Sequence, residues 1–146
     1  MARNNPFKRE RFLHFQAIPT RWMDNDVYQH VNNVVYYSFF DTAINQFLIE
    51  RGVLDIEKST TIGLVVETQC QYFSPITFPD VVTSGIRVDK IGKSSVHYSI
   101  GLFREACDSA SAQGSFVHVY VDAITRRPTP ISEEMLTVLS QISASN

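Results

Sequence analysis

One short segment of the chain concentrates the side chains that could do chemistry. Residues 21–33 include two carboxylates, one imidazole and two neighbouring carboxamides: Asp24, Asp26, His30, Asn32 and Asn33. They stand just before a predicted helix, whose first turn has backbone N–H groups that carry partial positive charge and lack intrahelical partners. Directed at a carbonyl, such groups would form an oxyanion site, where one donor lowers a barrier by roughly 3–4 kcal/mol. A carboxylate beside that site could act as a general base or a nucleophile.

The same residues also have a purely structural interpretation. Asp and Asn side chains accept hydrogen bonds from nearby backbone N–H groups, so they commonly cap turns and helix starts. Capping is the commoner role for an Asp-x-Asp motif that is followed by Asn-Asn. The residue types alone therefore leave both interpretations open.

The helix that would position these groups is predicted from the residues that follow. Asn32 or Asn33 can serve as its N-cap, and Gly52 is placed to end it. Between them, apolar residues recur with the 3.6-residue period of a helix: Tyr36, Phe40, Ala43, Ile44 and Phe47. Among the polar positions between residues 38 and 46, only Asp41 is charged. We therefore expect the helix to be buried over much of its circumference.

After Gly52 the hydrophobic period changes to two, which is typical of strands with one face on a core. A long strand is predicted over residues 62–73, and alternating strands over 82–89, 96–103 and 117–122. A further strand lies within residues 12–23, where Pro19 favours an edge position or a bend. A short helix is predicted from Ser132 to about residue 142. One buried helix with these antiparallel strands predicts an α+β fold, in which a curved sheet wraps round the helix.

Length and composition limit the possible classes of protein. The chain has 146 residues, 44% of them hydrophobic, with 15 acidic and 13 basic side chains. That length predicts one domain over residues 1–146, with residues 1–10 frayed, and the apolar content excludes disorder. A protein that binds nucleic acid through phosphate contacts would be more basic than the net charge of −2.

The cysteines and the apolar runs bear on location. Cys70 and Cys107 form no CxxC motif and no metal-ligand spacing, so we expect a reducing compartment. No apolar run approaches the roughly 20 residues needed to span a bilayer, and we find no pattern typical of a signal peptide. We therefore expect a soluble, cytoplasmic protein that binds neither membranes nor nucleic acid.

Read in order, the motifs resemble a known family. Residues 20–37, TRWMDNDVYQHVNNVVYY, are similar to the signature of the hot-dog-fold acyl-CoA thioesterases of the 4-hydroxybenzoyl-CoA thioesterase type. The resemblance spans roughly residues 20–131, with further matches at FDTA (40–43), YFSP (72–75), IGKSS (91–95) and VYVDAITRRPTP (119–130). It implies a curved antiparallel sheet around one long central helix, and hydrolysis of acyl-CoA to a free carboxylic acid and coenzyme A.

The resemblance also implies roles for individual residues. Asp26 matches the catalytic carboxylate of the family, and Asp24 matches the residue that shapes the loop. The backbone N–H near Asn33 matches the donor that polarises the thioester carbonyl at the helix start. His30, also assigned to the catalytic group, stands in a His-Val-Asn-Asn variant of the motif, where the benzoyl enzyme has an apolar stretch.

The remaining expectations concern substrate and partners. Substrate contacts are assigned to Asp24, Asn32, Tyr36, Lys93, Arg126 and Arg127. The last three are candidates for the coenzyme A phosphates, which need cations at the mouth of the pocket. The resemblance implies no metal and no redox cofactor, since coenzyme A enters as part of the substrate. It implies a homodimer or homotetramer, formed by sheets paired edge to edge, with active sites at the dimer interface.

Several alternatives stay open. Asp26 could remove a proton from water, or could attack the thioester to form an anhydride that is later hydrolysed. Asp41 is a second candidate carboxylate, because another hot-dog group places its catalytic acid on the central helix. His97 and His118 are expected at solvent or an interface. The alternative functions are a dehydratase or hydratase acting on acyl thioesters, with Asp26 and His30 as acid and base, or a non-catalytic acyl-CoA-binding module.

Overall fold

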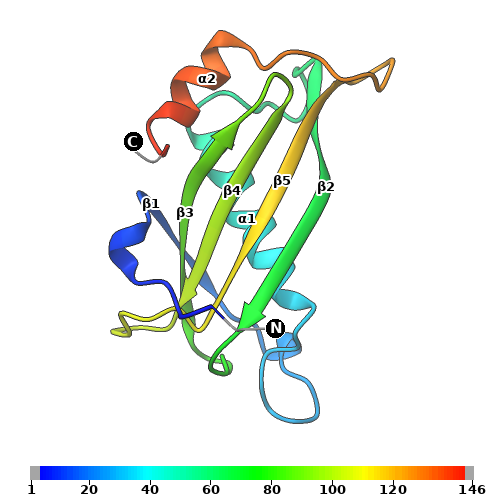
Figure 1. Ribbon diagram of the computed structural model, residues 1–146. Helices are drawn as coiled ribbons and strands as arrows, with labels where there is room; N and C mark the ends of the chain where they lie inside the picture. Colours follow the sequence, from blue (N-terminus) through cyan, green and yellow to red (C-terminus); the bar gives the residue numbers. More distant parts are fainter. Residues whose placement is uncertain (1–3, 144–146) are drawn as a thin grey trace.

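Five antiparallel strands form one sheet that lies across a long helix, α1 (Figure 1). The computed structural model describes residues 4–143. Along the chain its main elements are β1 (His14–Pro19), α1 (Val35–Glu50), β2 (Thr61–Tyr72), β3 (Val81–Ile91), β4 (Ser95–Phe103), β5 (Ala112–Asp122) and α2 (Glu133–Ser140). The strand order is β1-β3-β4-β5-β2, so β1 and β2 are the two edges. The predicted α+β class is confirmed, as is the edge position of the strand that contains Pro19.

The buried face of α1 forms the centre of the core. All five apolar positions that set the predicted period are buried there, with Phe40, Ala43, Ile44 and Phe47 fully enclosed. Gly52 follows the helix with φ of +76°, the left-handed conformation predicted for its end. The start differs from the prediction, because the helix begins at Val35. The Asn32 side chain instead forms a turn before the helix and accepts a hydrogen bond from the Val34 N–H at 3.1 Å.

The row of β5 that faces α1 is aromatic, and this corrects the placement of one histidine. Val96 and Tyr98 of β4 are fully buried on the helix side, and the strand register places His118 and Phe116 opposite them. His118 is only 3% exposed, so the expectation that it lies at solvent or an interface is wrong. Sequence alternation shows that two rows exist, but does not show which row faces the helix.

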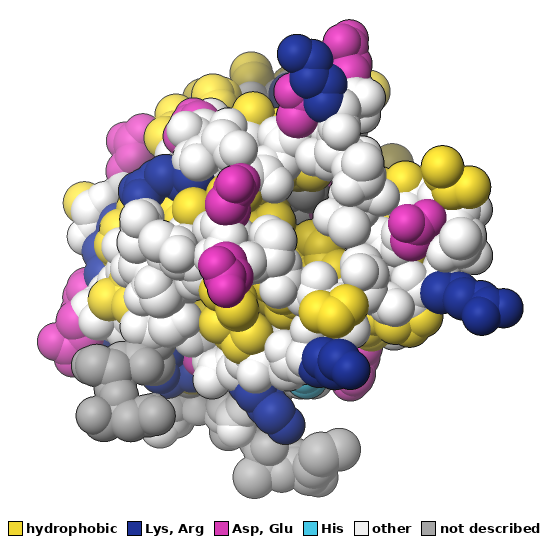
Figure 2. Space-filling model, turned by 90° about the horizontal axis from the view of Figure 1, so that it is seen from above, with side chains coloured by type: hydrophobic (Ala, Val, Ile, Leu, Met, Phe, Trp, Pro, Cys, Tyr) yellow, Lys and Arg dark blue, Asp and Glu magenta, His cyan; other side chains and the backbone are white. Residues whose placement is uncertain are grey.

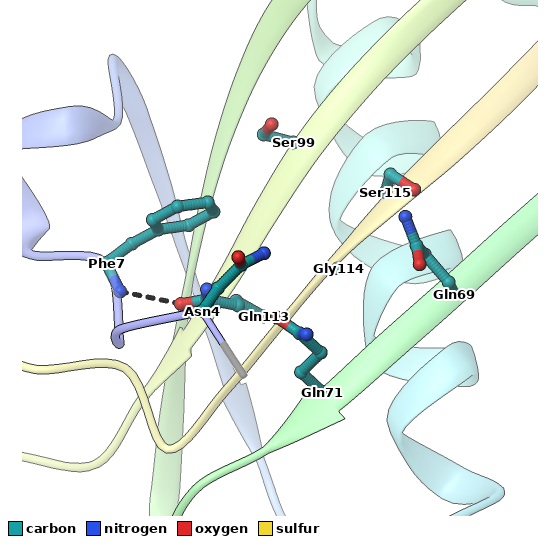
Figure 3. Close-up of a pocket in the computed structure, with 8 residues that line it drawn as sticks. All are labelled: Asn4, Phe7, Gln69, Gln71, Ser99, Gln113, Gly114 and Ser115. Carbon is teal, nitrogen blue, oxygen red and sulfur yellow. Dashed lines mark hydrogen bonds between the residues drawn. The ribbon is translucent and has the colours of Figure 1, made fainter. Parts of the chain in front are cut away.

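The segment before β1 covers the outer face of the sheet. Fraying was expected for residues 1–10; residues 1–3 lie outside the described part, and the residues after them make specific contacts. The Phe7 N–H donates to Oε1 of Gln113 at 2.6 Å (Figure 3). Nε2 of Gln113 donates to the Asn5 carbonyl at 3.1 Å. The Phe12 ring packs directly against Gly85 and Gly101. A Cβ atom on Gly85 would lie only 2.7 Å from this ring, and a Cβ atom on Gly101 only 2.5 Å from it. These two glycines therefore allow the segment to reach the sheet.

Candidate active site

The loop from β1 to α1 is held together by Asp24. This side chain is 1% exposed, and its two oxygens accept hydrogen bonds from the Arg21 N–H at 2.7 Å and from the Arg21 guanidinium at 2.9 Å. The same carboxylate raises the pKa of Arg21. The Asp24 carbonyl also accepts from the Asn32 N–H at 2.8 Å. Asp24 thus holds the loop together, and its buried side chain does not line the cleft formed by Asp26 and the start of α1.

Asp26 lies at the base of a tight turn within that loop. Its N–H donates to the His30 carbonyl at 2.9 Å, and its Oδ1 accepts from the Tyr28 N–H at 2.9 Å. Gln29 has φ of 68°, which lets the chain reverse between these two contacts. The side chain is half-buried, and within residues 4–143 its Oδ2 has no hydrogen-bond partner. One carboxylate oxygen therefore maintains the turn, while the other is free to act.

The start of α1 presents one unpaired backbone donor. The N–H groups of Val34 and Val35 donate to the side chain and the carbonyl of Asn32, and the Tyr36 N–H donates to the Asn33 carbonyl. The Asn33 N–H makes no hydrogen bond within the described residues. In a trans peptide the N–H and C=O point in opposite directions. Because the Asn32 carbonyl points into the helix, the Asn33 N–H points away from it.

These groups line one open cleft of about 440 Å³. Its wall comes from the loop, the first turn of α1 and the end of β2, and includes Asp26, His30, Asn33, Tyr36 and Tyr72. In Figure 1 the loop extends below the sheet, at the end where α1 begins. Four of the predicted site residues are therefore brought together, namely Asp26, His30, Asn33 and Tyr36.

Tyr72 is the contact that residue-type reasoning missed. Its hydroxyl donates to the Asn33 carbonyl at 2.9 Å, and its ring packs edge-on against Tyr36, with centroids 4.9 Å apart. Burial raises the pKa values of both phenols, so both stay protonated at neutral pH. The signal available in the sequence was a tyrosine at the end of the long strand, just before Ser-Pro. Nothing in that pattern indicates that β2 ends beside the start of α1.

The three predicted phosphate-binding cations lie far from this cleft in the same chain. Lys93 is in the turn between β3 and β4, and Arg126 and Arg127 follow β5, all at the end of the sheet opposite the loop (Figure 1). β3 alone has 11 residues, which span roughly 35 Å. Seen from that end, Lys and Arg side chains are spread out instead of forming one patch (Figure 2). One chain therefore does not bring these residues to Asp26.

Asp41 also lies outside the cleft. It is on the exposed face of α1, where its Oδ1 accepts a hydrogen bond from Nδ2 of Asn45 at 2.9 Å. Among the described residues, no group of three His, Cys, Asp or Glu side chains could hold a metal ion. None of the described helices is long and apolar enough to cross a membrane.

A five-stranded antiparallel sheet lying across one long central helix is the hot-dog fold. The family profile described as "Thioesterase-like superfamily" matches residues 20–139, and the chain belongs to that superfamily. This membership confirms the family resemblance and supports hydrolysis of a thioester. None of the curated proteins matches the chain significantly.

Solved structures agree with this assignment. The PA5185 protein from Pseudomonas aeruginosa is 51% identical, covering 96% of this chain and 98% of that one, with a TM-score of 0.93. The PA2801 protein of the same organism, described as a proposed thioesterase, is 26% identical over 88% of this chain and 98% of its own, with a TM-score of 0.81. The DHNA-CoA thioesterase from Staphylococcus aureus shares the fold at 19% identity, covering 87% and 86% of the two chains, with a TM-score of 0.76.

Proposed function

We propose that this protein hydrolyses acyl-CoA thioesters to a free carboxylic acid and coenzyme A. One observation carries the proposal: the half-buried Asp26 carboxylate and the unpaired Asn33 N–H line the same cleft. A carboxylate base and a backbone donor are two groups that acyl transfer to water can use, one to activate the nucleophile and one to stabilise the developing oxyanion.

The chemistry follows from this arrangement. The thioester carbonyl accepts a hydrogen bond from the Asn33 N–H, which draws negative charge onto its oxygen. Asp26 takes a proton from a water molecule as the water oxygen attacks the carbonyl carbon, and the thiolate of coenzyme A leaves and is protonated. Alternatively, Asp26 attacks the carbon itself and the C–S bond breaks, so that the thiolate of coenzyme A leaves and takes up a proton; water then hydrolyses the anhydride to the free acid and the Asp26 carboxylate. In both routes Oδ1 of Asp26 keeps its hydrogen bond from the Tyr28 N–H, and Oδ2 is the oxygen that reacts.

His30 and Tyr72 support these two groups in the proposed site. The His30 carbonyl holds the Asp26 N–H, and the His30 ring lies at the exposed rim of the cleft. Tyr72 holds the Asn33 carbonyl and so limits rotation of the backbone at the helix start. Tyr36, buried beneath the helix start, is the proposed floor of the acyl-binding region.

The proposed active form is a homodimer or homotetramer built on the edge strand β2. Its residues Leu64, Val65 and Val66 are 39%, 46% and 60% exposed, and an exposed apolar edge is a template for pairing with another strand. Antiparallel pairing of two β2 strands would place the first residues of one beside the last residues of the other. The Ala123 N–H donates to the Thr60 carbonyl, so the segment with Arg126 and Arg127 sits at the first end.

Pairing would therefore bring those arginines of the second copy toward the Asp26 cleft of the first. This would supply the cations for the coenzyme A phosphates that one chain lacks at the cleft.

The oligomeric state tests this arrangement. Light scattering should give a mass of two or four times the 16.6 kDa of one chain. Val66→Glu should yield monomers with little activity, because a charge on the edge strand opposes pairing. Full activity in a Val66→Glu monomer would contradict the shared site.

A thiol-release assay tests the proposed reaction. The protein is incubated with short, medium, long and aromatic acyl-CoA thioesters, and free coenzyme A is measured. Release from at least one class is expected, and no release from any class would overturn the proposal. Enoyl-CoA and 3-hydroxyacyl-CoA in the same series test for a hydratase or dehydratase, which would add or remove water without releasing thiol. Binding of acyl-CoA without turnover would indicate a non-catalytic module.

We also propose a cytoplasmic location. Cys70 and Cys107 are both free thiols, as expected for a reducing compartment.

A further inference from the structure

The turn that carries Asp26 is a short hairpin with two arms. At its base, Asn25 pairs with Val31 as an antiparallel bridge. One residue further along, the Asp26 N–H donates to the His30 carbonyl at 2.9 Å. The tip projects toward solvent, and Tyr28 there is 78% exposed. A two-stranded hairpin is only marginally stable by itself in water, so the direction in which this one projects must be fixed at its base.

Both arms of the hairpin are tied to the same distant segment, residues 76–78, which lies between β2 and β3. On the first arm, Oδ1 of Asn25 accepts a hydrogen bond from the Phe78 N–H at 3.1 Å. On the second arm, the Val31 N–H donates to the Ile76 carbonyl at 2.7 Å. Although 53 residues separate Asn25 from Phe78, this segment supports the hairpin from below.

The supporting segment is itself held in place. Ile76 is fully buried in the core. The N–H and the hydroxyl of Thr20, just after β1, both donate to the Asp80 carbonyl, at 3.1 and 2.6 Å. The ring of Phe78 also packs edge-on against Trp22, with centroids 5.8 Å apart. The segment is therefore a fixed point against which the hairpin can be oriented.

The two ties depend differently on the sequence. The bond between Val31 and Ile76 joins two backbone groups, so it does not depend on which side chains stand there. The bond from Phe78 needs an acceptor on the side chain of residue 25. Among residues 4–143, Nδ2 of Asn25 makes no hydrogen bond, so only the acceptor oxygen is in use. Asparagine often caps its own turn, but here its oxygen reaches a backbone N–H in another part of the chain.

The position of Asp26 relative to Asn33 depends on this support. Oδ1 of Asp26 accepts from the Tyr28 N–H of the same hairpin, so the carboxylate moves with the hairpin. The Asn33 N–H belongs to the start of α1, a helix packed in the core. A shift at the base of the hairpin would therefore change the distance from Oδ2 of Asp26 to the Asn33 N–H. A misplacement of about 1 Å can lower a rate by roughly 100-fold.

We propose that Asn25 is a positioning residue for Asp26. Its hydrogen bond from the Phe78 N–H fixes the arm that leads into Asp26, and so holds Oδ2 at its place across the cleft from the Asn33 N–H. Asn25 does not itself line that cleft, so its effect is exerted through Asp26. The effect on turnover rests on the proposed hydrolysis, whereas the anchoring of the hairpin does not.

Asn25→Ala tests the effect on turnover. It removes the acceptor, and kcat should fall about tenfold with KM nearly unchanged, because alignment of Asp26 matters in the transition state more than in binding. Asn25→Asp keeps an acceptor oxygen at the same position and should recover most of the lost kcat when assayed at pH 8, where carboxyl groups are ordinarily ionised. Parental kcat in Asn25→Ala, or a loss expressed only in KM, would overturn the positioning role.

Ser132→Ala is a matched control for general destabilisation. Oγ of Ser132 accepts a hydrogen bond from the Met135 N–H at 3.1 Å, the same kind of side-chain contact to a backbone N–H. It lies at the start of α2, at the opposite end of the sheet from the hairpin (Figure 1). Its loss should lower the unfolding midpoint about as much as Asn25→Ala does and leave kcat at the parental value. An equal fall of kcat in both variants would mean that the effect is not specific to the hairpin.

Amide hydrogen exchange tests the anchoring without any substrate. The Asp26 N–H, which donates to the His30 carbonyl, exchanges when the hairpin opens locally. In Asn25→Ala its exchange should be about tenfold faster, the effect of one lost hydrogen bond, while the amides of β5 exchange at the parental rate. An unchanged rate at Asp26 would refute the anchor. If the parent chain released thiol from none of the substrates, the hydrolysis would be refuted, and the exchange rates would still decide whether Asn25 holds the hairpin.

Discussion

The two ends of α1 carry sites of opposite character. At the start of the helix, an open cleft combines a half-buried carboxylate with an unpaired backbone donor, and both of these groups come from 13 consecutive residues, 21–33. Near its C-terminal end, a mostly apolar cavity is lined by segments far apart in the sequence, and one of its residues, His118, has a buried Nδ1 with no hydrogen-bond partner within residues 4–143. The comparison teaches that local chain geometry brings the groups of the cleft together, whereas the surroundings of His118 come from the packing of distant strands.

The largest effect is expected from Asp26→Asn. The two side chains have the same shape, so the turn and the Tyr28 N–H contact should persist while the base or nucleophile is lost. Turnover should fall by roughly 100- to 10,000-fold, with little change in the unfolding midpoint. Asp80→Asn is a matched control, since Asp80 is also half-buried and accepts one backbone N–H, from Thr77. If both variants keep parental turnover, Asp26 is not the catalytic group.

Asp24→Asn tests whether the cleft depends on the buried carboxylate beneath it. Both oxygens of Asp24 accept hydrogen bonds from Arg21, and an amide group would replace one acceptor with a donor. We expect the free energy of unfolding to fall by roughly 1–3 kcal/mol, and turnover to fall with it as the loop loosens. Urea denaturation and the thiol-release assay measure the two effects. An unchanged stability would show that the loop is held by its backbone contacts alone.

The cleft at the helix start was largely predictable from the sequence, for a physical reason. Asp26, His30 and Asn33 belong to one loop, and a helix start must follow them, so their proximity is a consequence of chain connectivity. The finer details depended on packing. The Asn32 side chain forms a turn ahead of the helix, and the free donor is the Asn33 N–H because all its neighbours are paired.

The cavity near the end of α1 could not be predicted, because alternation alone does not say which row of a strand faces the helix. The valines of β5 were the obvious core row, but the aromatic row around His118 is the one that fills the space against α1. The contact of Phe7 with Gln113 was equally hidden, since 106 residues separate the partners. Lys93, Arg126 and Arg127 were expected together as phosphate-binding cations. The strand topology places them at the end of the sheet opposite the Asp26 cleft.

The pH dependence of stability isolates the contribution of the buried His118 imidazole. Burial lowers the pKa of His118 from 6.5, with the charge of Asp41 opposing the shift, so the unfolded chain binds this proton more readily than the folded one. The contribution is complete above pH 6.5 and is lost as the pH falls below it. Between pH 8 and pH 5 the parent chain should therefore lose more stability than His118→Phe does. His14, whose pKa is also lowered by burial, is present in both chains and cancels in the difference. Parallel pH profiles would show that His118 stays accessible to protons.

The smallest effect is expected from Tyr72→Phe, which removes a contact between the sheet and the start of α1. Tyr72 ends β2, and its hydroxyl is the one side-chain contact from the sheet to the Asn33 carbonyl within the described residues. Removing it leaves the ring packed against Tyr36 and leaves the Tyr36 N–H on that carbonyl at 3.4 Å. Loss of one hydrogen bond should lower kcat about fivefold and leave KM nearly unchanged, because the donor at Asn33 is less well oriented. Tyr37→Phe, whose hydroxyl makes no hydrogen bond among residues 4–143, is the matched control. Equal kcat values in the two variants would mean that the helix start orients its own donor without help from the sheet.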